Sequence, residues 1–132
     1  METITIIIEK TTDYYDAYAE NCEGVYGAGE TVEAAKNDVL KGLELLIESR
    51  EKKELPKILQ DKYNIVFKYD TQSFLNYYNK IFTNVALERL TGINQKLLHH
   101  YSSGLKKPRE IQREKIEKAL HNLGNELLAV RL

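Results

Sequence analysis

The stretch NVALERLTGINQKLLHHYSSGLKKP, residues 84–108, decides how the second half of the chain folds. Leu87 and Leu98 are apolar at the positions where two short helices would bury side chains against each other. Gly92 allows a tight turn between the helices, because glycine adopts positive φ without a steric penalty. Asn94 is a favourable N-cap for the second helix. The stretch therefore predicts two short helices joined by a tight turn.

The flanking segments are also predicted to be helical. One apolar stripe at helical spacing precedes the stretch and comprises Phe74, Leu75, Tyr78, Ile81 and Phe82. Thr83 is a favourable N-cap for the helix after it. Downstream, Pro108 is expected to open a fourth helix that Gly124 and Asn125 interrupt. Residues 126–132 would form a short apolar tail helix that packs on its own domain, or alternatively makes a dimer contact.

The first half alternates between strand and helix patterns. Strands are expected at residues 3–9, at 14–20, around Val25 and Tyr26, and at 63–69, with a helix over residues 32–49 that Thr31 caps. Glycines follow the second strand at positions 24, 27 and 29, and we interpret all three as turn residues. The pattern predicts a small β-β-β-α-β sheet with a helix on one face, so the other face meets solvent or a partner.

The sign of the net charge changes along the chain near residue 72, close to where the mixed strand-and-helix pattern gives way to helices. The 132 residues carry a net charge of −1, but residues 1–72 carry −6 and residues 73–132 carry +5. An acidic half suits a basic protein partner and a basic half suits nucleic acid, although a chance distribution is the simpler alternative. We therefore expect the α+β class with two domains, residues 1–70 and 71–132. The 42% hydrophobic content excludes a wholly disordered chain.

Targeting signals and disulfides are not expected. No apolar run approaches the ~20 residues that a membrane span requires. The opening Met1-Glu2 lacks the basic start of a secretory signal, and the single Cys22 excludes an internal disulfide framework. These features predict a cytoplasmic protein with no membrane partner.

Residues 84–108 resemble the helix-turn-helix of the Xre and phage-repressor family. The resemblance implies that the second helix lies in the DNA major groove and that the surrounding residues contact the backbone. The base-reading residues it implies are Gln95, Lys96, His99, His100 and Ser103. The backbone contacts it implies are Asn84, Lys106, Lys107 and Arg109. Glu88 departs from the small residue of the family, so the helices would cross wider or the acid would lean outward. The alternative is a helix-turn-helix kept only for dimerisation.

Residues 3–70 resemble the HicB antitoxin domain. The residues that carry the likeness are YYDAYAE at 14–20 and GVYGAGETVEAA at 24–35. The segment ENCEG at 20–24 departs from the family's Pro-Asp-Leu-Pro-Gly, and Ala34 replaces an acid. The resemblance implies a partial RNase H-like fold that binds a HicA-type mRNA-cleaving toxin. A helix-turn-helix after the last strand is a known arrangement in this family.

The two resemblances predict an antitoxin that neutralises a HicA-type toxin and represses its own operon. It would bind double-stranded operator DNA as a homodimer or a higher even oligomer. The alternatives are a stand-alone transcription regulator whose first domain senses a ligand or protein, and an RNase H-type enzyme. We expect no catalytic residues, cofactor or metal: adjacent His99 and His100 point about 100° apart on a helix. The acids Glu9, Asp13, Asp16 and Glu20 are expected to form a solvated edge.

Overall fold

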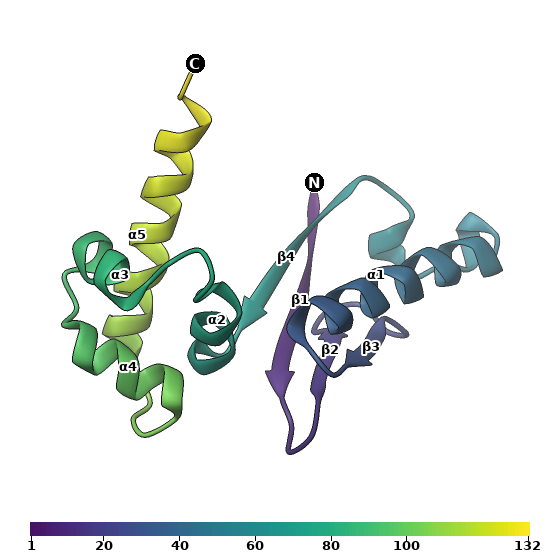
Figure 1. Ribbon diagram of the computed structural model, residues 1–132. Coiled ribbons are helices and arrows are strands. Elements are labelled where there is room, and N and C mark those ends of the chain that lie inside the picture. Colours follow the sequence, from purple (N-terminus) through teal and green to yellow (C-terminus); the bar gives the residue numbers. More distant parts are fainter. The chain divides into compact units, whose positions relative to one another are not determined.

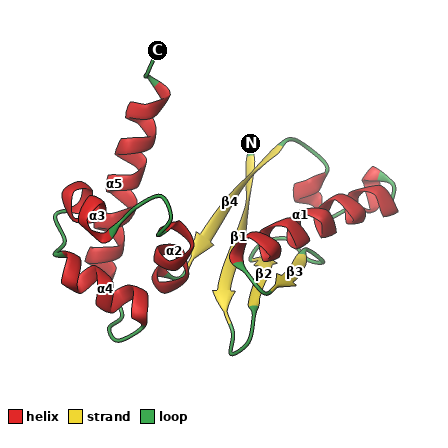
Figure 2. Ribbon diagram, viewed as in Figure 1, coloured by secondary structure: helices red, strands yellow, loops and turns green.

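The computed structural model describes residues 1–132 and shows a mixed α+β protein. The chain forms two compact units, residues 1–73 (unit 1) and residues 74–132 (unit 2). The boundary expected from the sequence, between residues 70 and 71, lies three residues before the one between the two units. Every strand lies in unit 1, whereas unit 2 is helical (Figure 2). None of the helices combines the length and the apolar character that crossing a membrane requires.

Unit 1 contains one four-stranded sheet (Figure 1). Its strands are β1 (Glu2–Lys10), β2 (Tyr15–Ala19), β3 (Tyr26–Gly29) and β4 (Tyr63–Tyr69). The spatial order is β3-β2-β1-β4; β1 and β4 are parallel, and the other pairs are antiparallel. The helix α1 (Val32–Ser49) follows β3, which gives the expected β-β-β-α-β order. Two short 3-10 helices between α1 and β4, η1 (Lys52–Glu54) and η2 (Lys57–Leu59), were not expected.

The sheet buries one of its faces. Ile4, Ile6 and Ile8 of β1 are fully buried, because alternate residues of a strand point to the same face. In the parallel register Ile6 lies beside Phe67 of β4, whose ring is 4.4 Å from the ammonium of Lys36 on α1. Helix α1 therefore covers this face, as the sequence predicted, whereas Tyr26 and Val66 on the opposite face are exposed.

Two of the three glycines are not turn residues. Only Gly24, with φ of +85°, has the left-handed conformation of a turn. Gly27 and Gly29 lie in β3, where a Cβ on Gly27 would be 2.5 Å from the backbone nitrogen of Val39 in α1. A Cβ on Gly29 would be 2.6 Å from the backbone nitrogen of Ala35 in α1. The turn interpretation is wrong for these two positions, which are glycine because strand and helix backbones touch.

Unit 2 packs short helices against one long helix. Its helices are α2 (Thr71–Tyr78, which begins at the end of unit 1), α3 (Asn84–Thr91), α4 (Gln95–Ser103) and α5 (Glu110–Leu128). The buried side chains of its core are Leu75, Leu87, Ile93, Leu98, Tyr101 and Ile116. The core thus draws residues from all four helices and from the turn between α3 and α4.

Helix α2 is shorter than the apolar stripe predicted. It ends at Tyr78, and Ile81 lies outside it with 69% of its surface exposed. Phe82 packs against the core of unit 2 from the segment before α3. The backbone N–H of Phe82 donates to the Tyr78 carbonyl, which makes a compact turn rather than further helix. The prediction that Ile81 belongs to the buried stripe is wrong.

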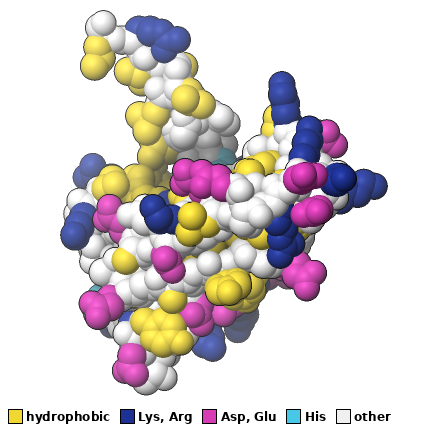
Figure 3. All heavy atoms as spheres, turned by 90° about the vertical axis from the view of Figure 1, so that its right-hand side faces the viewer, with side chains coloured by type: hydrophobic (Ala, Val, Ile, Leu, Met, Phe, Trp, Pro, Cys, Tyr) yellow, Lys and Arg dark blue, Asp and Glu magenta, His cyan; other side chains and the backbone are white.

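Helix α5 is longer than predicted and its far end is exposed. The helix begins after its N-cap residue Arg109 rather than at Pro108, and it continues through Gly124 to Leu128. An isolated glycine costs only about 1 kcal/mol in a helix, so it does not by itself end one. Leu127 and Leu128 are 60% and 78% exposed, and hydrophobic side chains line this projecting end (Figure 3). The prediction of a separate tail helix that packs on its own domain is therefore wrong.

Candidate nucleic-acid interface

The joint between α3 and α4 is held by local hydrogen bonds. The hydroxyl of Thr83 caps α3 by accepting from the N–H of Ala86 at 3.0 Å. Gly92 ends α3 in the left-handed conformation with φ of +76°, which explains the glycine. The buried hydroxyl of Thr91 accepts from the N–H of Ile93 at 3.0 Å. These bonds fix the path of the turn, because each satisfies a backbone group that the helix ends leave free.

The start of α4 is held by one side chain from the turn and one from α3. The Asn94 side chain accepts from the N–H of Lys96 at 2.8 Å, as the sequence predicted for an N-cap. A carboxylate oxygen of Glu88 accepts from the N–H of Gln95 at 2.7 Å. Glu88 thus leans onto the N-terminus of α4, where the helix dipole favours a negative charge. Glu88 therefore links the two helices.

The predicted reading residues of α4 lie on the side away from the core. Gln95, Lys96, His99 and Ser103 are exposed and His100 is half-buried. Leu98 and Tyr101, on the other side of the helix, are buried in the core of unit 2. Because residues 95, 99 and 103 are four apart, they follow one line along the helix surface. The structure therefore presents an uninterrupted polar surface along α4.

The predicted backbone-contacting residues lie at helix ends and in one loop. Asn84 is the first residue of α3 and is half-buried. Lys106 and Lys107 follow Gly104, which ends α4 with φ of +83°, and both are exposed. Arg109 is the N-cap residue of α5, but its side chain makes no capping hydrogen bond. The Arg109 guanidinium therefore forms no hydrogen bond that caps α5.

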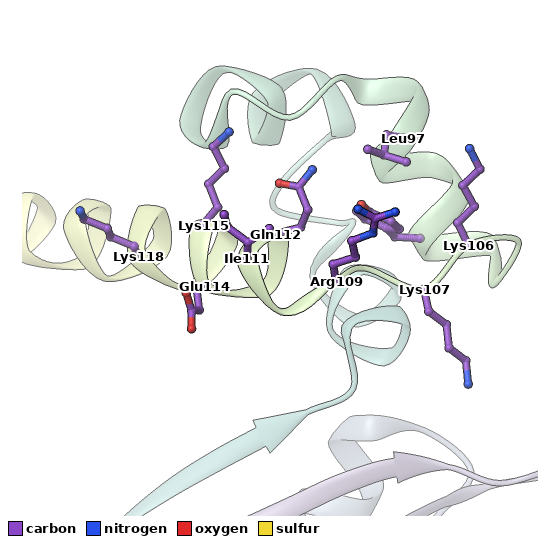
Figure 4. Close-up of a pocket in the computed structure, with 10 residues that line it drawn as sticks. Leu97, Lys106, Lys107, Arg109, Ile111, Gln112, Glu114, Lys115 and Lys118 are labelled. Atoms are coloured by element: carbon purple, nitrogen blue, oxygen red, sulfur yellow. The ribbon is translucent and has the colours of Figure 1, made fainter.

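A groove of about 920 Å³ lies between α4 and α5 (Figure 4). The residues that line it are Leu97, Tyr101, Lys106, Lys107, Arg109, Ile111, Gln112, Glu114, Lys115 and Lys118. Sequence reasoning missed Lys115 and Lys118, because the resemblance ends at Pro108, before α5 begins. The two lysines are three residues apart, a spacing that places them on one side of a helix. This spacing is the sequence signal that could have identified them.

The metal-ligating side chains and the single cysteine of the chain are candidates for a reactive cluster. The structure has no group of three or more His, Cys, Asp or Glu side chains arranged to hold a metal ion. Cys22 is a buried free thiol, and desolvation by burial raises its pKa, which makes the thiolate scarcer at neutral pH. Buried cysteines of this kind are structural rather than reactive.

The open face of the sheet in unit 1 is a second candidate surface. In the strand registers Tyr26, Tyr18, Ile7 and Lys68 form one row across the four strands on the face opposite α1. The Tyr18 hydroxyl donates to a carboxylate oxygen of Glu9 at 3.0 Å. This hydrogen bond raises the pKa of Tyr18, because it holds the hydroxyl proton, and the negative charge of Glu9 further disfavours the phenolate.

Comparison with known proteins found no matching family model, no matching curated protein and no matching solved structure.

Proposed function

We propose that this chain is an antitoxin of the HicB type. Unit 1 would neutralise a HicA-type mRNA-cleaving toxin by direct binding, and unit 2 would repress the operon through a helix-turn-helix formed by α3 and α4. The partial RNase H-like description of unit 1 belongs to the same proposal. The observation that carries it is the α3–Gly92–α4 joint, whose caps and left-handed glycine hold a polar helix surface away from the core.

The exposed chemistry of α4 supports direct readout of bases. A glutamine side chain can pair with adenine through two hydrogen bonds, and a lysine can donate to guanine. Gln95 and Lys96 are both exposed at the N-terminal end of α4, which is the end that reads bases in this type of motif. The loop cations Lys106 and Lys107 would supply phosphate contacts.

The DNA-binding role is tested by binding of the purified chain to its own promoter fragment and to a scrambled duplex of equal length. We expect tighter binding to the promoter, and Gln95→Ala should reduce that preference by about 1–3 kcal/mol. The control is Asn122→Ala, which removes an exposed side-chain amide from α5, outside both the proposed reading surface and the groove between α4 and α5. Equal affinity of the unsubstituted chain for both duplexes would contradict sequence-specific repression.

The charge and the open face of unit 1 support the toxin-binding role. The segment 1–72 carries a net charge of −6, which attracts a basic RNA-binding protein. Tyr26 is 73% exposed and Val66 is 42% exposed on the face opposite α1. Exposed aromatic and aliphatic side chains flanked by acids are a surface that a basic partner can bury.

Co-expression with the adjacent small open reading frame tests this role. We expect the chain to restore growth that the neighbour inhibits and to co-purify with it. A double substitution on the open face, Asp16→Lys with Tyr26→Ala, should abolish both effects. Glu117→Lys on α5 is the control, because it reverses one charge outside unit 1. A neighbour that is neither toxic nor bound would overturn the antitoxin role.

A stand-alone regulator with a ligand-sensing first domain is the second candidate. One observation favours it, a hollow of about 360 Å³ lined by residues that include Asp16, Tyr18, Tyr26 and Asp38. The Asp38 carboxylate accepts from the N–H of Ala28 on β3, so this carboxylate is held in place at the edge of the hollow. A small molecule that raises the thermal stability of the chain, and whose effect Tyr26→Ala removes, would support this function over the first.

A further inference from the structure

We propose that the DNA-binding surface of unit 2 extends along α5 to Lys115 and Lys118. The groove between α4 and α5 would receive the sugar–phosphate backbone of the duplex that α4 reads. This inference rests on the proposed DNA-binding function and adds two binding residues to it. It also assigns an occupant to the groove between α4 and α5, whose α5 side lies beyond the helix-turn-helix resemblance.

The charge of the groove is the first argument. Five of its ten lining residues are cations, namely Lys106, Lys107, Arg109, Lys115 and Lys118, and its one acid is Glu114. None of these cations forms an ion pair in the structure. Figure 4 shows Lys106, Arg109 and Lys115 directed to one side, whereas Lys107 and Glu114 are directed to the other. Lys106, Arg109 and Lys115 therefore present positive charge on one side of the groove, where it is available to an anion.

The length of the charged row is the second argument. Lys118 lies nine positions after Arg109, which corresponds to roughly 14 Å along a helix that rises 1.5 Å per residue. Duplex DNA carries one negative charge per ~1.7 Å of its axis. The row is therefore long enough to meet several phosphates, which fits a polyanion better than a single phosphate group.

The composition of the lining is the third argument. The apolar side chains of Leu97, Tyr101 and Ile111 lie among the cations. Such a lining offers few fixed polar groups that would orient a small ligand, whereas small-molecule sites depend on precisely placed ones. Lysine ammonium groups on flexible stems act as point charges for phosphate oxygens. The groove therefore suits a backbone that contributes charge and no sequence information.

The salt dependence of DNA binding tests the inference directly. Fluorescence anisotropy would give the dissociation constant of the full chain for a labelled duplex of random sequence over a series of salt concentrations. Each phosphate that a protein neutralises contributes about 0.9 to the slope of log K against log[salt], so two contribute about 1.8. We expect Lys115→Gln with Lys118→Gln to lower the slope by that amount and to weaken binding at low salt.

Two variants control for net charge and for side-chain shape. Lys41→Gln with Lys57→Gln removes the same charge from exposed positions of unit 1 and should leave the slope unchanged. Lys115→Arg with Lys118→Arg keeps the cations and should keep the slope. Thermal unfolding of each variant, compared with the unsubstituted chain, shows whether a change in binding reflects a change in folding.

The outcomes separate this inference from the function on which it rests. A slope unchanged by the double glutamine variant, while the unsubstituted chain binds DNA, would overturn the groove assignment and leave the DNA-binding role standing. An unsubstituted chain that binds no duplex at low salt would overturn both. An equal loss in the unit 1 control would also overturn the inference, because long-range charge would then explain the effect.

Discussion

At the scale of single residues, the tightest constraint lies where β3 meets α1. Gly27 faces the backbone of Val39 so closely that no side chain fits between them. Backbone atoms cannot rotate aside as a flexible side chain can, so the strand and the helix would have to separate. By contrast, a Cβ on Gly124 in α5 has no atom within 4 Å.

We therefore predict opposite effects of alanine at these two glycines. Gly27→Ala should lower the free energy of unfolding by about 1–3 kcal/mol, the usual cost of overpacking. Gly124→Ala should raise it by about 0.5–1 kcal/mol, because alanine is the better helix former at a site with free space. Urea unfolding followed by circular dichroism measures both. Equal stability of Gly27→Ala and the parent chain would contradict the close contact.

Cys22 gives a second prediction at this scale. The native thiol should react with iodoacetamide far more slowly than the same thiol in denaturant, because burial both shields it and raises its pKa. A raised pKa in the folded state also means that this group's contribution to stability is present below its unfolded pKa and is lost as pH rises through the folded value. Native and denatured alkylation rates that agree at pH 8 would refute the burial of Cys22.

At the scale of elements, α3 and α4 are joined by more than the turn between them. The Glu88 carboxylate reaches from α3 to the N–H of Gln95, a donor that α4 itself cannot satisfy. Such a contact works as a cap supplied by a neighbouring helix. It couples the position of the polar surface on α4 to the core that α3 helps to build.

We predict that Glu88→Ala destabilises unit 2 by about 1 kcal/mol, the typical value of a helix cap. Glu117→Ala, which removes an exposed acid from α5, is the control and should change stability by less than about 0.5 kcal/mol. Chemical unfolding of both variants provides the comparison. Equal effects would show that the Glu88 carboxylate does not cap α4 in solution.

At the scale of the whole molecule, the exposed end of α5 is a candidate contact between two copies of the chain. Ile116, Leu120, Leu123 and Leu127 follow one another at spacings of four, three and four residues, the repeat of helices that pair in coiled coils. Ile116 is buried in the core of unit 2, whereas Leu127 is 60% exposed. The stripe thus continues beyond the core, and a second copy of the chain is the partner that the proposed operator binding requires.

We predict that the chain sediments as a dimer or a higher even oligomer in analytical ultracentrifugation. Leu127→Asp should convert it to a monomer, because a carboxylate would be buried at the centre of the contact. The control Ile81→Asp changes an exposed aliphatic residue outside α5 and should not alter the oligomeric state. A parent chain that is monomeric at high concentration would contradict the homodimer.

Local features were predictable from the sequence because they depend on neighbouring residues. The caps by Thr31, Thr83 and Asn94 were predicted correctly, since each side chain accepts from a backbone N–H two or three residues away. The strand Tyr63–Tyr69 was predicted at its observed bounds, because alternating exposure follows from alternating polarity. Gly92 ends a helix through its own backbone conformation. These elements follow from dihedral preference and periodicity alone.

Tertiary structure decided the features that join distant residues. Gly27 is required by Val39 twelve positions later, and the Glu88 carboxylate acts seven positions away. Lys106, in the loop after α4, and Lys118, in the middle of α5, line one groove. No pattern of neighbours encodes these contacts, because they arise only when packing of the core brings separate elements together. The sequence by itself therefore determined the order of the strands and of the main helices and the caps at several helix starts, because these depend on neighbouring residues. Packing decided where α2 and α5 end and which surfaces the elements form.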